Sequence, residues 1–177
     1  VHHRNEKELI AADMDRHIDM AIECLRPFSM LASDTFVVKG TECHTQGLED
    51  LLAQELEAVS GKAKEKWLVE INGCLVDAAH HMSTSGRAYL EASAMSIHMG
   101  NARVNSVRSG HKVPKVFLRA HRHCGGYFSD GAGLFCVTGG WQFLTRHGHK
   151  VVTDSVPSPT VMVLDWRNLP KNSLPKV

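Results

Sequence analysis

Two histidines separated by one residue stand directly after a short apolar run in the third quarter of the chain. The run is Val116-Phe117-Leu118, and the histidines are His121 and His123. Side chains two apart in an extended segment point to the same side, so both imidazoles can face one point. Imidazole binds zinc, copper, iron and nickel, and sites for these ions need further ligands. The pair therefore predicts part of a transition-metal site.

Other histidines follow other predicted strands. The run Thr35 to Lys39 is followed by Gly40 and then His44, and a strand over 74–79 runs into His80-His81. If neighbouring strands bring these ends together, three or four imidazoles meet at one edge of a sheet. Taken singly, each histidine is better explained as a loop residue or a satisfied core histidine, and only their repetition at strand ends favours a site. In another interpretation, the chain is a structural protein and none of these histidines has a functional role.

Several other polar residues near these histidines stay ambiguous from the sequence. Glu42 and Asp77 are the nearest acids, and each fits a ligand, a partner of a ligand or a solvated side chain. Cys124 fits a ligand or a small buried thiol. His147 and His149 resemble an exposed basic loop more than a site. We find no nucleophile elbow, phosphate-binding loop or dinucleotide fingerprint.

The apolar spacing predicts an α/β fold in one domain over residues 1–177. Asn72-Gly73 between two apolar runs predicts a hairpin of strands 66–71 and 74–79. We expect further buried strands at 35–39, 115–120, 134–138 and 160–166, and a polar loop over 127–133. The expected helices are Asn5 to Leu25, stopped by Pro27, then 47–59, then 85–107 with Ala94, Ile97 and Val104 inward. The tail 167–177 is expected to be loose.

Composition limits the class of protein. The 177 residues are 43% hydrophobic and 22% charged with a formal net charge of +1, which gives no general footprint for nucleic acid or membrane. No apolar run approaches the length of a transmembrane helix. Five scattered cysteines favour free thiols in a reducing cytoplasm. A local basic run remains a candidate nucleic-acid groove or a solvated face: Arg103, Arg108, Lys112, Lys115, Arg119 and Arg122.

In order, these blocks resemble the second half of the calcineurin-like metallophosphoesterase family. That family ends successive strands in D-x-H, G-D, G-N-H, a lone H and G-H-x-H. The segment VVKGTECH at 37–44 is similar to the G-N-H block, and VDAAHH at 76–81 to the lone-histidine block. The segment LRAHRH at 118–123 is similar to G-H-x-H, with Ala120 in place of glycine.

The resemblance implies a layered β-sandwich flanked by helices and a phosphoester hydrolase, either a phosphatase, a phosphodiesterase or a nuclease. It implies two divalent ions (Mn, Zn, Fe or Ni) that activate water and stabilise the leaving oxygen. By the same resemblance, His80 and His121 hold one ion and His123 the other, with His81 replacing His80 if the register shifts by one. His44 would assist the transition state, and Glu42 would replace the missing ligating asparagine.

The D-x-H and G-D blocks of the family have no counterpart before residue 35, and the sequence given starts at Val1. Those blocks supply the bridging aspartate and much of the first metal site. We therefore expect these 177 residues alone to be hydrolytically weak or inactive. The alternative is a non-catalytic module that keeps the fold and binds metal or a partner. Two ions per chain would favour the enzyme, and one or none the module. The oligomeric state is left open.

Overall fold

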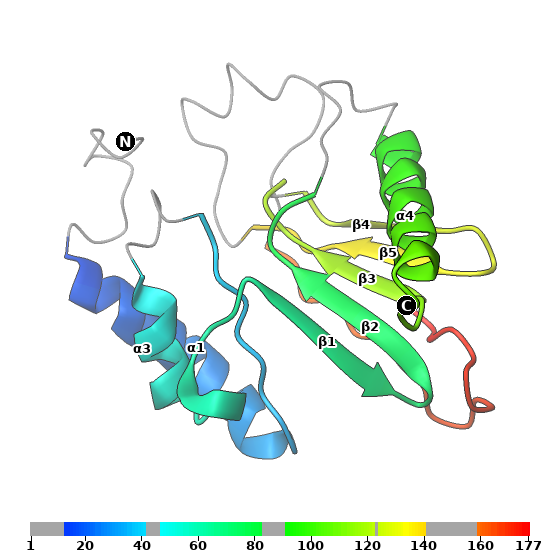
Figure 1. The fold of residues 1–177 in the computed structure, drawn as a ribbon. Coiled ribbons are helices and arrows are strands. Elements are labelled where there is room, and N and C mark those ends of the chain that lie inside the picture. Colours follow the sequence, from blue (N-terminus) through cyan, green and yellow to red (C-terminus); the bar gives the residue numbers. More distant parts are fainter. Residues whose placement is uncertain (1–12, 42–46, 83–90, 123, 141–158) are drawn as a thin grey trace. The chain divides into compact units, whose positions relative to one another are not determined.

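The computed structural model in Figure 1 describes residues 13–41, 47–82, 91–122, 124–140 and 159–177. The described residues belong to two compact units, one within 1–66 and the other within 67–177. The metal-ligand candidates Glu42, His44 and His123 lie outside the described residues, as do His147 and His149. Among the predicted ligands, the structure therefore describes His80, His81 and His121, together with the two ambiguous candidates Asp77 and Cys124.

The described part of the first unit contains two α-helices. Helix α1, Met14–Leu31, starts where the Asp13 carboxylate accepts a hydrogen bond from the backbone N–H of Asp15. The prediction that Pro27 stops this helix is wrong. Proline removes one backbone donor, and the turn beyond it still closes, since the N–H of Ala32 bonds the carbonyl of Phe28 at 3.1 Å.

Helix α3, Leu48–Glu55, is shorter than the predicted 47–59, because the backbone turns left-handed at Glu57 with φ 50°. A short 3-10 turn, η2, spans Val59–Gly61. The predicted buried strand at 35–39 is also wrong. This segment makes only an isolated parallel bridge, from Val38 to Lys64, and its side chains are half-buried or exposed.

The second unit begins with the predicted hairpin. Strand β1, Lys66–Ile71, and strand β2, Cys74–Ala79, are joined by Asn72 with φ 49° and Gly73 with φ 81°. Two successive left-handed residues are what a type I′ turn requires, and Asn-Gly supplies them with least strain. A Cβ atom at Gly73 would also stand 2.8 Å from the Asn172 side-chain oxygen. The turn prediction is confirmed.

The unit is built on an open five-stranded sheet in the order β1-β2-β3-β5-β4. Strands β2, β3 (Val116–Arg119) and β5 (Leu134–Val137) are parallel, and β4 (Gly126–Ser129) pairs antiparallel with β5. The mixed α/β class is confirmed. The prediction of a loop from 127 onward is wrong over β4, an edge strand that depends on its pairing with β5.

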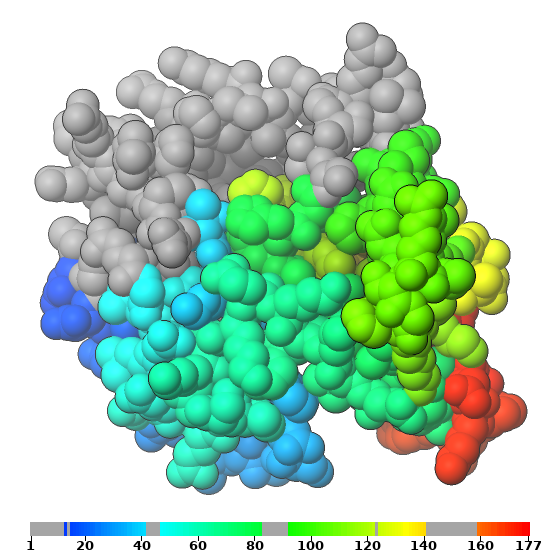
Figure 2. Space-filling view, viewed as in Figure 1, coloured from blue at the N-terminus to red at the C-terminus, as the bar shows by residue number. Residues whose placement is uncertain are grey.

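Alternate strand residues pack on opposite faces of the sheet. On one face, Phe117, Phe135 and Val137 form a core with Met95 and Met99 of helix α4, Glu91–Arg108. Figures 1 and 2 show α4 lying over this face at the surface of the unit. Of the predicted inward positions, Ala94 is buried as expected, whereas Ile97 and Val104 are 61% and 49% exposed, so the prediction is wrong for these two.

The opposite face is covered by the C-terminal segment 159–177. Its residues Met162, Leu164, Trp166 and Leu174 pack on the core residues Val76, Val116, Leu134 and Cys136. The expected strand 160–166 is not a strand, although its side chains do alternate: Val161 and Val163 are 64% and 71% exposed. The tail is not loose either, because Asn72 Nδ2 donates to the Pro170 carbonyl and Asn172 N to the Asn72 carbonyl.

Candidate metal centre

The ends of β2 and β3 bring two histidines together. The strands are parallel with Ala78 opposite Leu118, so both run toward the same edge of the sheet. Beyond the last pair, the backbone N–H of Ala120 donates to the carbonyl of His80 at 3.0 Å. His80 and His121 therefore meet just past the strand ends, as the sequence predicts for parallel strands.

Three imidazoles form a cluster at this edge. His80 Nε2 and His121 Nδ1 lie 3.1 Å apart, and the His81 ring centroid lies 4.8 Å from that of His80 and 4.7 Å from that of His121. One possible ligand atom from each residue falls within 4.8 Å of the other two. His80 is half-buried, whereas His81 and His121 are exposed.

These three side chains fit a transition-metal ion. With zinc–nitrogen bonds of about 2.0–2.1 Å, tetrahedral geometry separates two ligand nitrogens by roughly 3.3–3.4 Å. The 3.1 Å contact between His80 and His121 is close to that separation. In this contact one nitrogen donates a proton to the other, and a metal ion would replace that proton between them. An all-nitrogen set favours zinc, copper, iron or nickel over magnesium or calcium.

His121 has a left-handed backbone, with φ 71°. A residue with a Cβ in this conformation is strained by about 1–2 kcal/mol. The neighbouring bonds hold it there. The Ala120 N–H bonds His80, and the Arg119 carbonyl accepts from Thr138 N at 2.8 Å. The strain therefore lies at the residue that presents an imidazole to the cluster.

A buried ion pair, Asp77 with Arg119, lies two to three residues before the clustered histidines in the sequence. Arg119 is 4% exposed and Asp77 1% exposed, and Arg119 Nη2 is 3.0 Å from Asp77 Oδ1. Arg119 Nη1 also donates to the backbone carbonyls of Asp77 at 2.7 Å and Leu118 at 2.8 Å. Burial lowers the pKa of the Arg119 guanidinium, and the Asp77 carboxylate opposes this shift. Asp77 is thus a structural partner of Arg119, which resolves its ambiguous role.

Helix α4 covers the same arginine. Its His98 Nε2 lies 3.0 Å from Arg119 Nη2, which makes Nε2 the acceptor. The guanidinium carbon also lies 5.7 Å and 5.9 Å from the ring centroids of Phe117 and Phe135. These two rings stack with an interplanar angle of 14°. Arg119 is therefore enclosed by the strands, the aromatic core and α4.

The predicted basic run does not form one free surface. Besides Arg119, Arg103 forms two hydrogen bonds with Asp130, and Lys112 pairs with Glu70. Lys115 Nζ donates to the carbonyl of Asn172. Since these cations are bound to partners in different parts of the unit, the run gives little support to a nucleic-acid groove.

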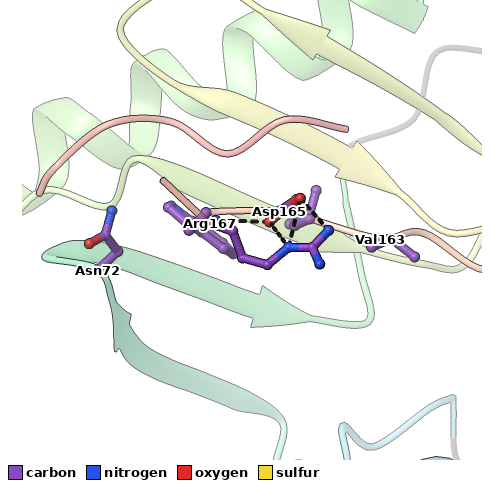
Figure 3. Close-up of a pocket in the computed structure, with 6 residues that line it drawn as sticks. Asn72, Val163, Asp165 and Arg167 are labelled. Carbon is purple, nitrogen blue, oxygen red and sulfur yellow. Dashed lines mark hydrogen bonds and ion pairs between the residues drawn. The ribbon is translucent and has the colours of Figure 1, made fainter. Parts of the chain in front are cut away.

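A shallow pocket lies elsewhere in this unit, lined by Asn72 and residues 163–167. Figure 3 shows Arg167 folded over the Asp165 carboxylate. The hydrogen bonds from Arg167 lower the pKa of Asp165 to about 2. Because the Asp165 carboxylate already accepts hydrogen bonds from Arg167, the pocket offers fewer groups for binding or catalysis than the histidine cluster.

Comparisons of the chain with protein-family models, with curated proteins and with solved structures give no match. Among the described residues, no helix is long and apolar enough to cross a membrane. The case for a function therefore depends on the residues of this chain.

Proposed function

We propose that the chain is part of a metal-dependent phosphoester hydrolase with a metal centre formed by His80, His81 and His121. The observation that carries the proposal is the convergence of these imidazoles at the ends of parallel strands, with 3.1 Å between two ligand nitrogens. The phosphoester class comes from the resemblance to calcineurin-like metallophosphoesterases. We also propose that the open sheet belongs to the layered β-sandwich that is typical of that family.

The histidines of the chain would hold the metal ion and orient their ring nitrogens toward it. His80 and His121 come from different strands, so their separation is set by the strand pairing, and His81 adds a third nitrogen from the exposed side. A divalent ion held there by these imidazoles would supply Lewis acidity toward water and a phosphoryl oxygen. The exposure of His81 and His121 leaves this edge open to a substrate. By the resemblance, His123 would hold a second ion.

Metal content and turnover test the proposal together. The chain should bind Mn²⁺ or Zn²⁺ and slowly hydrolyse bis(p-nitrophenyl) phosphate, a diester, or p-nitrophenyl phosphate, a monoester. His80→Ala and His121→Asn should lower metal affinity by more than the roughly 10- to 100-fold that loss of an outer partner causes. His111→Ala, at an exposed histidine outside the cluster, is the matched control and should bind metal and turn over as the parent does.

Two results would contradict the proposal. Metal affinity unchanged in both cluster variants would make the histidines incidental. Because weak or absent turnover is expected of these 177 residues alone, the number of bound ions decides between the two functions: binding of a single ion through the cluster, with no turnover of either ester, would favour the alternative, a non-catalytic metal-binding or partner-binding module.

A further inference from the structure

The ion pair between Asp77 and Arg119 stands next to the histidine cluster in sequence and in space. Asp77 precedes His80 by three residues on β2, and Arg119 precedes His121 by two on β3. Both side chains are buried on the face of the sheet that α4 covers. A buried arginine and aspartate are expensive to desolvate, and replacement by apolar residues is often neutral or stabilising. Stability alone is therefore a poor explanation for the pair.

The contacts of Arg119 converge on the strand ends that carry the histidines. Its guanidinium bonds the backbone of β2 at Asp77 and the backbone of β3 at Leu118. Its own carbonyl accepts from both the N–H and the hydroxyl of Thr138, which follows β5. One residue thus connects three neighbouring parallel strands directly before His80 and His121.

The same contacts limit how far His121 can relax. Arg119 and Ala120 are the two residues before the left-handed His121, and both have their backbone groups bonded to other strands. From α4, His98 Nε2 accepts from Nη2 of the same guanidinium. If the strand ends separated or the backbone left the left-handed region, the 3.1 Å approach of the two ring nitrogens would be lost.

We infer that Arg119, held by Asp77 and His98, is a positioning residue for the metal centre: it fixes the ends of β2 and β3 so that His80 and His121 present their nitrogens to one ion. This inference rests on the proposed metal site and adds to it a residue that does not touch the metal. A lysine cannot replace this arginine, because one ammonium group cannot bond two carbonyls, a carboxylate and an imidazole in the fixed directions of the guanidinium.

Cobalt binding to the full chain tests the inference, because Co²⁺ reports affinity by titration and ligand geometry by its visible absorption. Arg119→Lys should bind Co²⁺ roughly 10- to 100-fold more weakly than the parent, with an altered absorption band. The matched control is Arg103→Lys, which disturbs another arginine–aspartate pair described in this unit, the two hydrogen bonds from Arg103 to Asp130, away from the histidines. This control should keep the affinity and the spectrum of the parent.

A second variant separates positioning from stability. Asp77→Leu combined with Arg119→Met removes both buried charges, so the fold should survive, yet the bonds to the Asp77 and Leu118 carbonyls are lost. We expect the same weakened Co²⁺ binding from this folded double variant. Parental affinity and spectrum in either folded variant would overturn the role of Arg119. Failure of the parent chain itself to bind Co²⁺ would overturn the metal site, and the inference with it.

Discussion

From the left-handed backbone of His121 we predict the relative stability of variants at this position, independently of metal binding and of function. With φ 71°, a residue that has a Cβ is strained by about 1–2 kcal/mol, and glycine is not. Glycine loses roughly 0.4–1 kcal/mol through its more flexible unfolded state. His121→Gly should therefore be more stable than His121→Ala by about 1 kcal/mol. Both variants lack the imidazole, so the lost contact with His80 cancels in the comparison.

Urea unfolding followed by tryptophan fluorescence, with EDTA present, measures this difference. His121→Asn should fall between the other two variants, because asparagine tolerates the left-handed region better than alanine. Ser96, exposed in the middle of α4, is the control position. There the order should reverse, with Ser96→Ala more stable than Ser96→Gly by about 1 kcal/mol. An alanine variant at His121 as stable as the glycine variant, or more stable, would refute the assignment of strain to this residue.

Two further predictions concern groups away from the cluster. Hydrogen bonds from Arg103 lower the pKa of Asp130 to about 2, whereas an unfolded chain titrates this carboxyl near pH 4, at about 3.9. Asp130→Asn should thus lower the free energy of unfolding by about 1 kcal/mol above pH 4. The difference from the parent should shrink as the pH falls toward 2. A difference in the free energy of unfolding that stays constant from pH 7 to pH 2 would contradict this. Burial raises the pKa of the Cys136 thiol to about 11, so at pH 8 it should react with DTNB far more slowly than the exposed Cys24. Mass spectrometry of the labelled sites would show the order, and equally fast labelling of both thiols would be the opposite result.

The parts of the fold that could be predicted are those encoded locally. Asn72-Gly73 specifies its turn with two residues, and the apolar runs that became β3 and β5 are short and bounded by polar residues and glycines. The meeting of His80 and His121 followed from one further step, that parallel strands end at the same edge. The left-handed backbone of His121 did not follow from the sequence. Nor did the position of His81 beside the other two imidazoles, since His81 was expected only as a substitute for His80.

The parts that could not be predicted depend on partners distant in sequence. Segment 160–166 has the alternation of a strand and does pack on the sheet through alternate residues, but a strand also needs a backbone neighbour, which composition does not reveal. Strand β4 is the reverse case: the polar, glycine-containing sequence of 127–133 suggested a loop, and pairing with β5 makes its first part a strand. Asp77 and Arg119 stand 42 positions apart, so only the register of β2 against β3 shows that their charges neutralise each other.

That register also explains why the histidines need no mutual attraction to meet. Phe117 stacks on Phe135 under α4, while Val116 packs on the opposite face with the C-terminal segment. A slip of one residue in β3 would exchange these faces and place Arg119 against apolar side chains. That slip is strongly disfavoured, because it would bury the charge of Arg119 without a partner. The apolar core and the ion pair thus both select one alignment of β2 and β3, and in that alignment His80 and His121 end side by side. Metal affinity should accordingly survive core substitutions that preserve the register.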